Sequence, residues 1–431
     1  MLDKFKGLKD AAKARIPAKG GEDTTRYLVG LDIGTEYVKA LIGRVHDDGI
    51  DIIGVGRAHQ GLADMQAGAV ADIGAVVENC DAALNEAEKQ AGVSARGAII
   101  GIAGELVKGT TTTVRVARKA PNKALDMPEV ERIIKLVQER AEAKAKKELA
   151  WELGGKNIDV RLVNSALVGI EIDGYQVTNP IGFQGRDVVV QLYTAFAPLV
   201  HIGALERVAE QLDLELIAVA AEPFAVARSV IGDDQSNTMS AVLMDVGGGT
   251  TDIAVINDGG VQGTKMFGIG GRAYTRSIER SLSVEFDLAE KLKVGLAEHK
   301  VAQRQVPAVE SALKKTLDVW MSGVELALGE FTKLDHLPHR LLLCGGGSSL
   351  DMLMDRLHDS DWYTHLPFTR KPVVQHIHPE QVVGITDTTG AVSDHTFITA
   401  MGLLRVGLDT VQYTGNNGNS VKEKIDRILH V

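Results

Sequence analysis

The chain contains apolar runs that end in glycine-rich turns, and the clearest example covers residues 241–252. Its apolar part is long enough for a buried strand, and it leads to Asp245 and a turn of small residues. The turn contains Gly247, Gly248, Gly249, Thr250 and Thr251. Because glycine has no Cβ, the backbone N–H groups of such a turn can approach a phosphate closely. A simple glycine-rich hairpin turn is the alternative interpretation.

A similar pattern occurs near the beginning of the chain, over residues 27–56. An apolar strand ends at an aspartate, a turn with a glycine and a hydroxyl follows, and two more strands complete the unit, as they do over residues 241–267. The residues of the first turn are Asp32, Gly34 and Thr35. Two such units indicate an internal duplication. If they face each other, they form a phosphate clamp between two domains, with Asp32 and Asp245 at its mouth, near a Mg²⁺.

Helical periodicity and short apolar runs predict the remaining elements. Helices are expected over residues 70–92, 126–137 with a charged extension, 202–212, 223–230 and 396–408, and in a long mixed-charge region that ends at residue 334. Strands are expected over residues 98–103, 160–171, 188–196, 216–220, 341–344 and 373–374. The chain is therefore predicted to belong to the α/β class, and residues 105–197 to form a small inserted α+β domain.

Two further positions lie where predicted strands end. Glu222 stands between a strand and a helix, where an acid interacts favourably with the helix dipole. In a nucleotide cleft, the same position could order water bound to Mg²⁺ or an attacking water. A third glycine turn, at residues 345–347, follows a buried strand, and its backbone could lie under a flat ring or an α-phosphate. It consists of Gly345, Gly346 and Gly347.

Both ends of the chain are candidate anchors. Residues 1–19 hold six Lys or Arg and place apolar residues on one helical face, which suits an anionic membrane surface. A solvated, frayed terminus is the alternative. Residues 420–431 form a second amphipathic segment after a polar linker, and a plain docking helix is the alternative there.

Composition narrows the class of function. The 431 residues are 45% hydrophobic and 24% charged, as in an ordinary globular protein. The net charge of −10 disfavours a nucleic-acid-binding surface, so we expect no nucleic-acid partner. The only two cysteines, Cys80 and Cys344, lie far apart, which suits a reducing cytosol and gives no zinc site. No apolar run approaches 18 residues.

The glycine motifs resemble those of the actin/Hsp70/sugar-kinase superfamily, over about residues 27–409. VGLDIGTEYVKALIG resembles its first phosphate motif, and MDVGGGTTDIAV with FGIGGRAYTRSIERSL the second. AEKLK resembles its nucleoside-contacting helix, and LLLCGGGSSL its adenosine motif. GAVADIGAVVENCDAALNEAEKQAG and NPIGFQGRDVV are similar to the bacterial FtsA family in particular.

The resemblance implies a two-domain actin-like ATPase fold of duplicated RNase H-like domains, with an inserted subdomain of the FtsA/PilM type. Together with the segments found above, we expect the chain to divide into a basic amphipathic segment (1–19), a linker (20–26), domain 1A (27–104 and 373–409), the inserted subdomain 1C (105–197), domain 2A (198–271 and 335–372), domain 2B (272–334), a linker (410–419) and an amphipathic tether (420–431). The N-terminal basic segment is not part of the family pattern.

The resemblance also implies residue roles around ATP and Mg²⁺. Phosphate contacts are implied for Asp32, Gly34, Thr35, Gly248, Thr250 and Thr251, with Gly247, Gly249 and Gly271 completing the loops. Asp245 and Glu222 are the implied catalytic pair. Asp32 and Asp245 are expected to reach Mg²⁺ through water. Glu290 and Lys293 are expected at the ribose and adenine, with the glycines at 345–347 beneath.

The implied function is a cytoplasmic protein, peripheral on the inner face of the cell membrane. It would form filaments there, bind the C-terminal peptide of FtsZ and hold the division ring at an anionic membrane, with at most slow ATP hydrolysis. A PilM-like adaptor of type IV pilus assembly shares the fold and remains the alternative. A small-molecule kinase has less support, because no further catalytic base is evident. An Hsp70-like chaperone would need a peptide-binding domain after the ATPase body.

Overall fold

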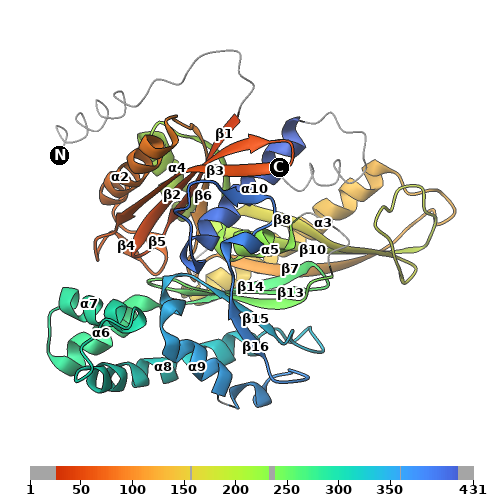
Figure 1. The fold of residues 1–431 in the computed structure, drawn as a ribbon. Coiled ribbons are helices and arrows are strands. Elements are labelled where there is room, and N and C mark those ends of the chain that lie inside the picture. The colour runs from red at the N-terminus through yellow and green to blue at the C-terminus, as the bar shows by residue number, and fades with distance from the viewer. Residues whose placement is uncertain (1–25, 156–157, 233–237, 360, 416–431) are drawn as a thin grey trace.

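The structure is a computed structural model that describes residues 26–155, 158–232, 238–359 and 361–415. Two predicted anchors, residues 1–19 and 420–431, lie outside the described residues. Two β-sheets organise the rest, and Figure 1 shows helices between them and on their outer faces. The predicted α/β class is confirmed.

The first sheet has six strands in the order β11-β6-β1-β2-β3-β17. Their bounds are β1 (Arg26–Ile33), β2 (Tyr37–His46), β3 (Gly49–His59), β6 (Gly97–Ile102), β11 (Glu215–Ala221) and β17 (Ile385–Asp387). A short hairpin of β4 (Met65–Gln66) and β5 (Ala69–Val70) follows β3. Because β1, β6 and β11 are parallel, their carboxyl ends meet at one edge of the sheet.

The second sheet has nine strands in the order β16-β15-β12-β13-β14-β7-β10-β8-β9. Their bounds are β7 (Lys108–Ala117), β8 (Val160–Ile172), β9 (Tyr175–Gln176), β10 (Asp187–Pro198), β12 (Ala241–Val246), β13 (Thr251–Asn257), β14 (Gly260–Phe267), β15 (Arg340–Cys344) and β16 (Val373–His376). One pair, Gly263 with Thr110, joins β14 to β7, so the strands of the inserted subdomain extend the sheet of the second domain.

The predicted duplication is present as two antiparallel three-strand units. In the first unit, β1 pairs with β2 and β2 with β3. In the second, β12 pairs with β13 and β13 with β14. Asp32 lies opposite Lys39 across β1 and β2, and Asp245 lies opposite Asp252 across β12 and β13. The two units therefore place their aspartates at the same position of the hairpin.

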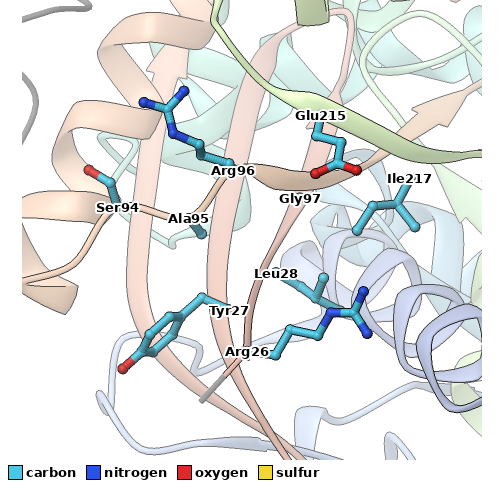
Figure 2. A pocket seen from close by; sticks show the side chains of 9 residues that line it. All are labelled: Arg26, Tyr27, Leu28, Ser94, Ala95, Arg96, Gly97, Glu215 and Ile217. Carbon is cyan, nitrogen blue, oxygen red and sulfur yellow. The ribbon is translucent and has the colours of Figure 1, made fainter. Parts of the chain in front are cut away.

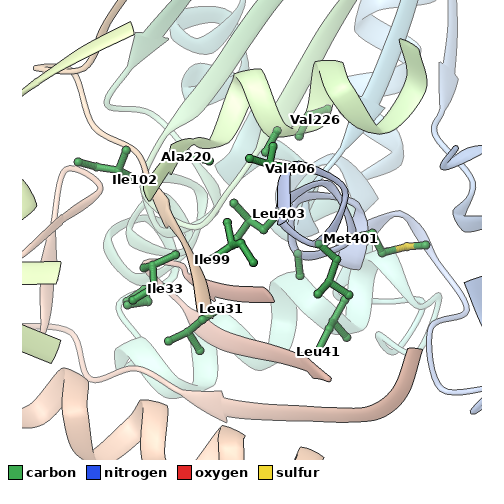
Figure 3. Packing of buried hydrophobic residues seen from close by; sticks show 14 of the residues in the cluster. Leu31, Ile33, Leu41, Ile99, Ile102, Ala220, Val226, Met401, Leu403 and Val406 are labelled. Carbon is green, nitrogen blue, oxygen red and sulfur yellow. The ribbon is translucent and has the colours of Figure 1, made fainter. Parts of the chain in front are cut away.

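Two helices, α5 (Glu222–Ile231) and α10 (Ile398–Gly415), pack on each other and on the first sheet. Figure 3 shows Val226 of α5 and Met401, Leu403 and Val406 of α10 against strand residues such as Ile99. Side chains from one face of β12 and β13 complete this core. The other face of the first sheet is covered by α2 (Ile73–Ala91), and α4 (Leu199–Gln211) packs near α2.

Alternate residues of β12 and β13 point into a second core. It is covered by α6 (Gly271–Leu282), α7 (Phe286–Ala297), α8 (Val306–Gly329) and α9 (Asp351–Asp359). Its largest fully buried side chains are Trp320 of α8 and Tyr274 of α6. This alternation explains why residues 241–244 form a continuous apolar run, since β12 is buried on both faces.

The inserted subdomain consists of β7, β8, β9 and β10 with α3 (Met127–Glu152) packed on them. Asp126 caps the first turn of α3 by accepting from the backbone N–H of Glu129. Buried Arg118, directly after β7, donates to both carboxylate oxygens of Glu129 at 2.9 Å and to two backbone carbonyls. The predicted charged extension belongs to α3, which packs Ala141 and Ala145 against Phe196.

Strand pairing differs at two places from the division expected from the sequence. β11 lies within residues 198–271 but pairs with β6 of the first sheet, and β16, which starts at Val373, pairs with β15 of the second sheet. Both strands lie at an edge of their sheet, where the chain passes from one domain to the other. A local apolar pattern does not specify the partner strand there. The long helical region expected to end at residue 334 is divided, since α7 ends at Ala297 and α8 ends at Gly329.

Candidate functional site between the duplicated units

The first loop follows β1. Asp32 is buried at the strand's end, and the Nζ of Lys39 on β2 donates to its Oδ2 at 2.9 Å. Lys39 is itself well buried, and although burial alone lowers the pKa of its ammonium, the nearby Asp32 and Asp245 carboxylates raise the pKa above its usual value overall. A cation is therefore held at the start of the loop that contains Gly34 and Thr35.

The second loop follows β12 and contains two buried carboxylates. Asp245 accepts a hydrogen bond from the Oγ1 of Thr399 on α10, so the contact joins the second sheet to a helix of the first core. Asp252 on β13 accepts from Thr250 at 3.0 Å, while its other oxygen has no hydrogen-bond partner in the described part of the chain. Burial raises the pKa of both carboxyl groups, and that of Asp252 is raised further by the Asp245 charge.

Glu222 brings a fourth carboxylate to the same place. It begins α5 directly after β11 and is buried. Burial raises its pKa well above the usual value, and the charges of Asp32, Asp252 and Asp245 raise it further. The strands β1, β12 and β13 and the beginning of α5 therefore bring their carboxylates into one electrostatic cluster. Lys39 offsets part of this charge.

The first and second glycine loops pack directly against each other. A Cβ added to Gly249 would lie 2.7 Å from the Oγ1 of Thr35, and one added to Gly248 would lie 2.8 Å from the Cβ of Glu36. Both distances are shorter than real Cβ contacts, so only glycine permits this approach. The two units therefore face each other, as the clamp interpretation of the sequence requires.

The residues expected at the nucleoside lie beside the second loop. Lys293 on α7 donates to Glu290 at 2.8 Å, to Thr275 at 2.9 Å and to the carbonyl of Gly271 at 3.1 Å. Glu290 also accepts from Thr275. Gly271 in turn donates its N–H to the carbonyl of Gly247. This network attaches α7 and the beginning of α6 to the second glycine loop.

The third glycine turn lies against the same loop. Gly345 has a φ of +81°, and a Cβ there would lie 2.0 Å from the Oδ1 of Asp245. A Cβ on Gly347 would meet Val246 at 2.6 Å, whereas one on Gly346 would meet nothing within 4 Å. Gly345 and Gly347 therefore allow the turn to pack tightly on β12, and Gly346 presents an open backbone surface.

Thr251 is one of the residues expected to contact phosphate, but its side chain binds other groups of the protein. Thr251 is fully buried, its hydroxyl donates to the carbonyl of Ile269 at 2.7 Å and accepts from Trp320 at 2.9 Å. Its side chain therefore holds β13 to the second core, and its only proton is already donated to Ile269. We therefore assign the Thr251 side chain a structural role, and the phosphate contact stays a prediction for its neighbour Thr250.

The carboxylates fit a hydrated magnesium ion better than a directly ligated one. In the described part of the chain, no three His, Cys, Asp or Glu side chains are arranged to hold a metal ion together. Yet four buried carboxylates repel one another, and Asp252 keeps a buried oxygen without a partner. Mg²⁺ keeps several of its waters and commonly binds proteins through only one or two carboxylates. The donor chemistry of the site therefore suits Mg²⁺ reached through water.

A pocket of about 310 Å³ lies elsewhere, at the opposite end of β1 from Asp32. Figure 2 shows Arg26, Tyr27 and Leu28 at the start of β1, beside Arg96 and Glu215. None of the predicted site residues lines it. We place the candidate site between the glycine loops, because the buried charges and the close-approach glycines lie there.

Three site residues were not assigned from the sequence: Lys39, Asp252 and Thr399. For two of them the signal was present. Lys39 follows Asp32 by seven positions, and Asp252 follows Asp245 by seven positions, so the duplicated units align them. Thr399 could not have been found in this way, since its contact with Asp245 is formed between distant segments.

Comparisons with known proteins show what the chain as a whole is similar to. The family model described as "Cell division protein FtsA" matches residues 242–402. The cell division protein FtsA of Pseudomonas aeruginosa is 27% identical to this chain. The alignment covers 89% of each of the two proteins. The cell division protein FtsA of Bacillus subtilis is 28% identical to this chain. That alignment covers 62% of this chain and 57% of the relative.

The resemblance to the FtsA family is confirmed. These relatives support an actin-like cell division protein as the broad class of this chain. A solved structure titled "PilM-PilN type IV pilus biogenesis complex" has a TM-score of 0.64 and 16% identity and covers 91% of this chain and 99% of its own. At that identity, the match supports the shared actin-like fold alone. No helix within the described ranges combines the length and apolar character needed to cross a bilayer.

Proposed function

We propose that this protein binds ATP with Mg²⁺ between its duplicated units, assembles into filaments at the cytoplasmic membrane, and anchors the FtsZ ring there during cell division. The observation that carries the nucleotide part is the meeting of two glycine loops around buried carboxylates and one buried lysine. The FtsA-like relatives support the division part.

Each group in the cleft has a distinct task in this proposal. The N–H groups of the loops at Gly34–Thr35 and Gly248–Thr250 cradle the phosphates, and Lys39 offsets their charge. Asp32 and Asp245 orient the waters around Mg²⁺, which neutralises phosphate charge when it is bound. Glu222, at the carboxyl end of β11, is placed to position a water near the phosphates.

Nucleoside recognition falls to the network beside the second loop. Glu290 and Lys293 are already hydrogen-bonded to each other and to Thr275, so binding requires them to exchange partners. The open backbone at Gly346 offers a flat surface for the nucleoside. We propose that ATP acts mainly by favouring the closed arrangement of the two domains, with at most slow hydrolysis.

Membrane tethering is assigned to residues 420–431 and, as a second anchor, to residues 1–19. Two weak anchors on one polymer act together more strongly than either does alone. Anionic liposomes should therefore pellet the full chain with ATP and Mg²⁺. Deleting residues 420–431 should reduce pelleting strongly, and deleting residues 1–19 should reduce it further. Retained pelleting after both deletions contradicts the tether.

Binding of the proposed partner, the C-terminal peptide of FtsZ, is tested in a separate experiment. Immobilised protein should retain a peptide with the sequence of the FtsZ C-terminus and release it in competition with free peptide. A peptide from the N-terminus of a pilus membrane protein serves as the comparison. Preferential retention of the pilus peptide would replace the division role by that of a PilM-like adaptor, which has the same fold.

A further inference from the structure

Arg272 is the residue that bridges the two domains on the cleft side. It lies in the first turn of α6, and its backbone N–H donates to the carbonyl of Gly248 in the second glycine loop at 2.7 Å. Its side chain crosses to the first domain, where the Nε donates to the Oε2 of Glu36 at 2.7 Å. One residue thus touches both loops.

The guanidinium enters a socket built entirely by the first domain. Besides the Glu36 carboxylate, three backbone carbonyls accept from it, those of Gln60 at 3.4 Å, Gly61 at 3.3 Å and Leu62 at 3.3 Å. Arg272 is only 9% exposed. A buried guanidinium with a carboxylate and three carbonyls differs from a surface ion pair, because its acceptors are matched to its planar fork.

The socket is attached to the first glycine loop. The N–H of Gln60 donates to the carbonyl of Glu36 at 2.9 Å, and the side chain of Gln60 reaches the carbonyl of Gly34. Asn79 on α2 donates to Gln60 at 2.6 Å, which holds that side chain in place. His59 contacts the second oxygen of Glu36 at 2.8 Å. Moving Arg272 out of the socket therefore releases constraints on the loop that carries Gly34 and Thr35.

We propose that Arg272 and Glu36 form a clasp that holds the two domains closed over the phosphates and slows nucleotide release. The nucleotide part of this inference rests on the proposed ATP binding, whereas the clasp itself is a property of the chain alone. Arg272 is a positioning residue, since it holds the two loops and need not touch the ligand. Opening the cleft must break all four of its side-chain contacts, which form with the first domain.

The clasp is tested by the distance between the domains without nucleotide. Spin labels on introduced cysteines, Ala82→Cys on α2 and Arg304→Cys before α8, report opening, since both sites are exposed and lie in different domains. The native cysteines are buried. The unsubstituted clasp should give one short-distance population. Arg272→Gln and Glu36→Gln should each add a second population with a longer distance between the labels.

Nucleotide release gives the second readout. Removing one member of a buried charge pair acts mainly on dissociation, so each variant should release a fluorescent ATP analogue more than about tenfold faster. The double variant should be no worse than Arg272→Gln alone, because that single variant has already lost the contact with Glu36. Arg272→Lys should recover part of the closed population. Arg276→Gln is the matched control, since Arg276 is exposed one turn along α6 and stacks over Phe286.

The outcomes separate the clasp from the proposed ATP binding. Unchanged distance distributions in both Arg272→Gln and Glu36→Gln overturn the clasp, whatever the nucleotide does. If the distances lengthen but the parent protein binds no nucleotide, the clasp stands and ATP binding fails. Far-ultraviolet circular dichroism identifies a variant that does not fold, in which case the other single variant decides.

Discussion

Lys39 and Asp252 occupy equivalent positions in the two duplicated units, each directly opposite the aspartate that lies one residue before the end of the preceding strand. In the first unit the pair is Asp32 with a cation, and in the second it is Asp245 with another carboxyl group. The duplication is therefore symmetric in backbone and opposite in charge. Lys39 therefore offsets the charge of the carboxylate in the first unit, whereas the second unit keeps two neighbouring carboxyl groups.

The first prediction concerns Lys39, the cationic side chain that binds Asp32. Lys39→Met leaves buried Asp32 without its partner, and breaking a buried ion pair in this way costs about 3–5 kcal/mol. Urea unfolding of the nucleotide-free protein measures this loss. Lys89→Met, at an exposed position near the end of α2, is the matched control and should change the free energy of unfolding by less than about 0.5 kcal/mol. Equal effects of the two substitutions would contradict a buried pair.

The second prediction concerns the opposite carboxyl group. Asp252→Asn removes a buried carboxyl group whose ionised form is disfavoured by burial and by the Asp245 charge, so the nucleotide-free protein should be as stable as the parent or more stable at neutral pH. The same variant should bind ATP with Mg²⁺ more weakly, because it lowers the negative potential that attracts the cation. Unfolding curves and magnesium titrations check the two effects. A destabilised variant with unchanged magnesium dependence would oppose this assignment.

The third prediction is a pH dependence. The pKa values of Glu222 and Asp252 are raised in the folded protein, mainly by burial, above their ordinary values of 4.5 and 3.8. The native state therefore keeps protons that the unfolded chain has lost. Their stabilising contribution is present below the unfolded pKa values and is lost as the pH rises through the raised ones. Urea unfolding over a pH series should show this fall, and Glu222→Gln should flatten it.

The same protonation should oppose magnesium binding. Mg²⁺ favours ionised carboxylates, so binding of ATP with Mg²⁺ should release protons and strengthen as the pH rises through this range. Calorimetry in two buffers of different ionisation enthalpy measures the number of protons released. A binding enthalpy that is independent of the buffer would contradict the coupling.

The fourth prediction concerns the contact between α10 and the second sheet. Thr399→Val removes the hydroxyl that donates to Asp245 and leaves a buried carboxylate oxygen without that donor. The cost should be about 1–3 kcal/mol, the usual penalty for an unsatisfied buried group. The pKa of Asp245 should rise further, because this hydrogen bond lowers it. Thr399→Ser keeps the hydroxyl and should lie close to the parent protein in unfolding experiments.

Local patterns in the sequence predicted those parts of the fold that depend on local chemistry. The apolar runs before Asp32 and Asp245 and the glycine turns after them were sufficient to predict both three-strand units. The pairing of β11 and β16 was not predictable in this way, because partner choice depends on strands far away in the chain. The same holds for the site. Close-approach glycines identify its loops, whereas Thr399 and Arg272 reach it only through packing of distant helices.

The role of Thr251 shows where motif reasoning stops. Thr250 and Thr251 are adjacent and chemically alike, so the sequence gives no reason to separate them. Side chains alternate along a strand, and Thr251 begins β13 with its hydroxyl toward Trp320, while Thr250 remains at the loop with Asp252. Only the position of the strand start distinguishes the two hydroxyls.

The central claim is that the two aspartates of the duplicated units act on one bound nucleotide. Equilibrium binding of a fluorescent ATP analogue, with and without Mg²⁺, tests it most directly in the parent protein, Asp32→Ala and Asp245→Ala. We expect saturable, magnesium-dependent binding in the parent and its loss in either variant, while Asp359→Ala, at the end of α9, binds like the parent. Undiminished magnesium-dependent binding in both cleft variants would contradict the account.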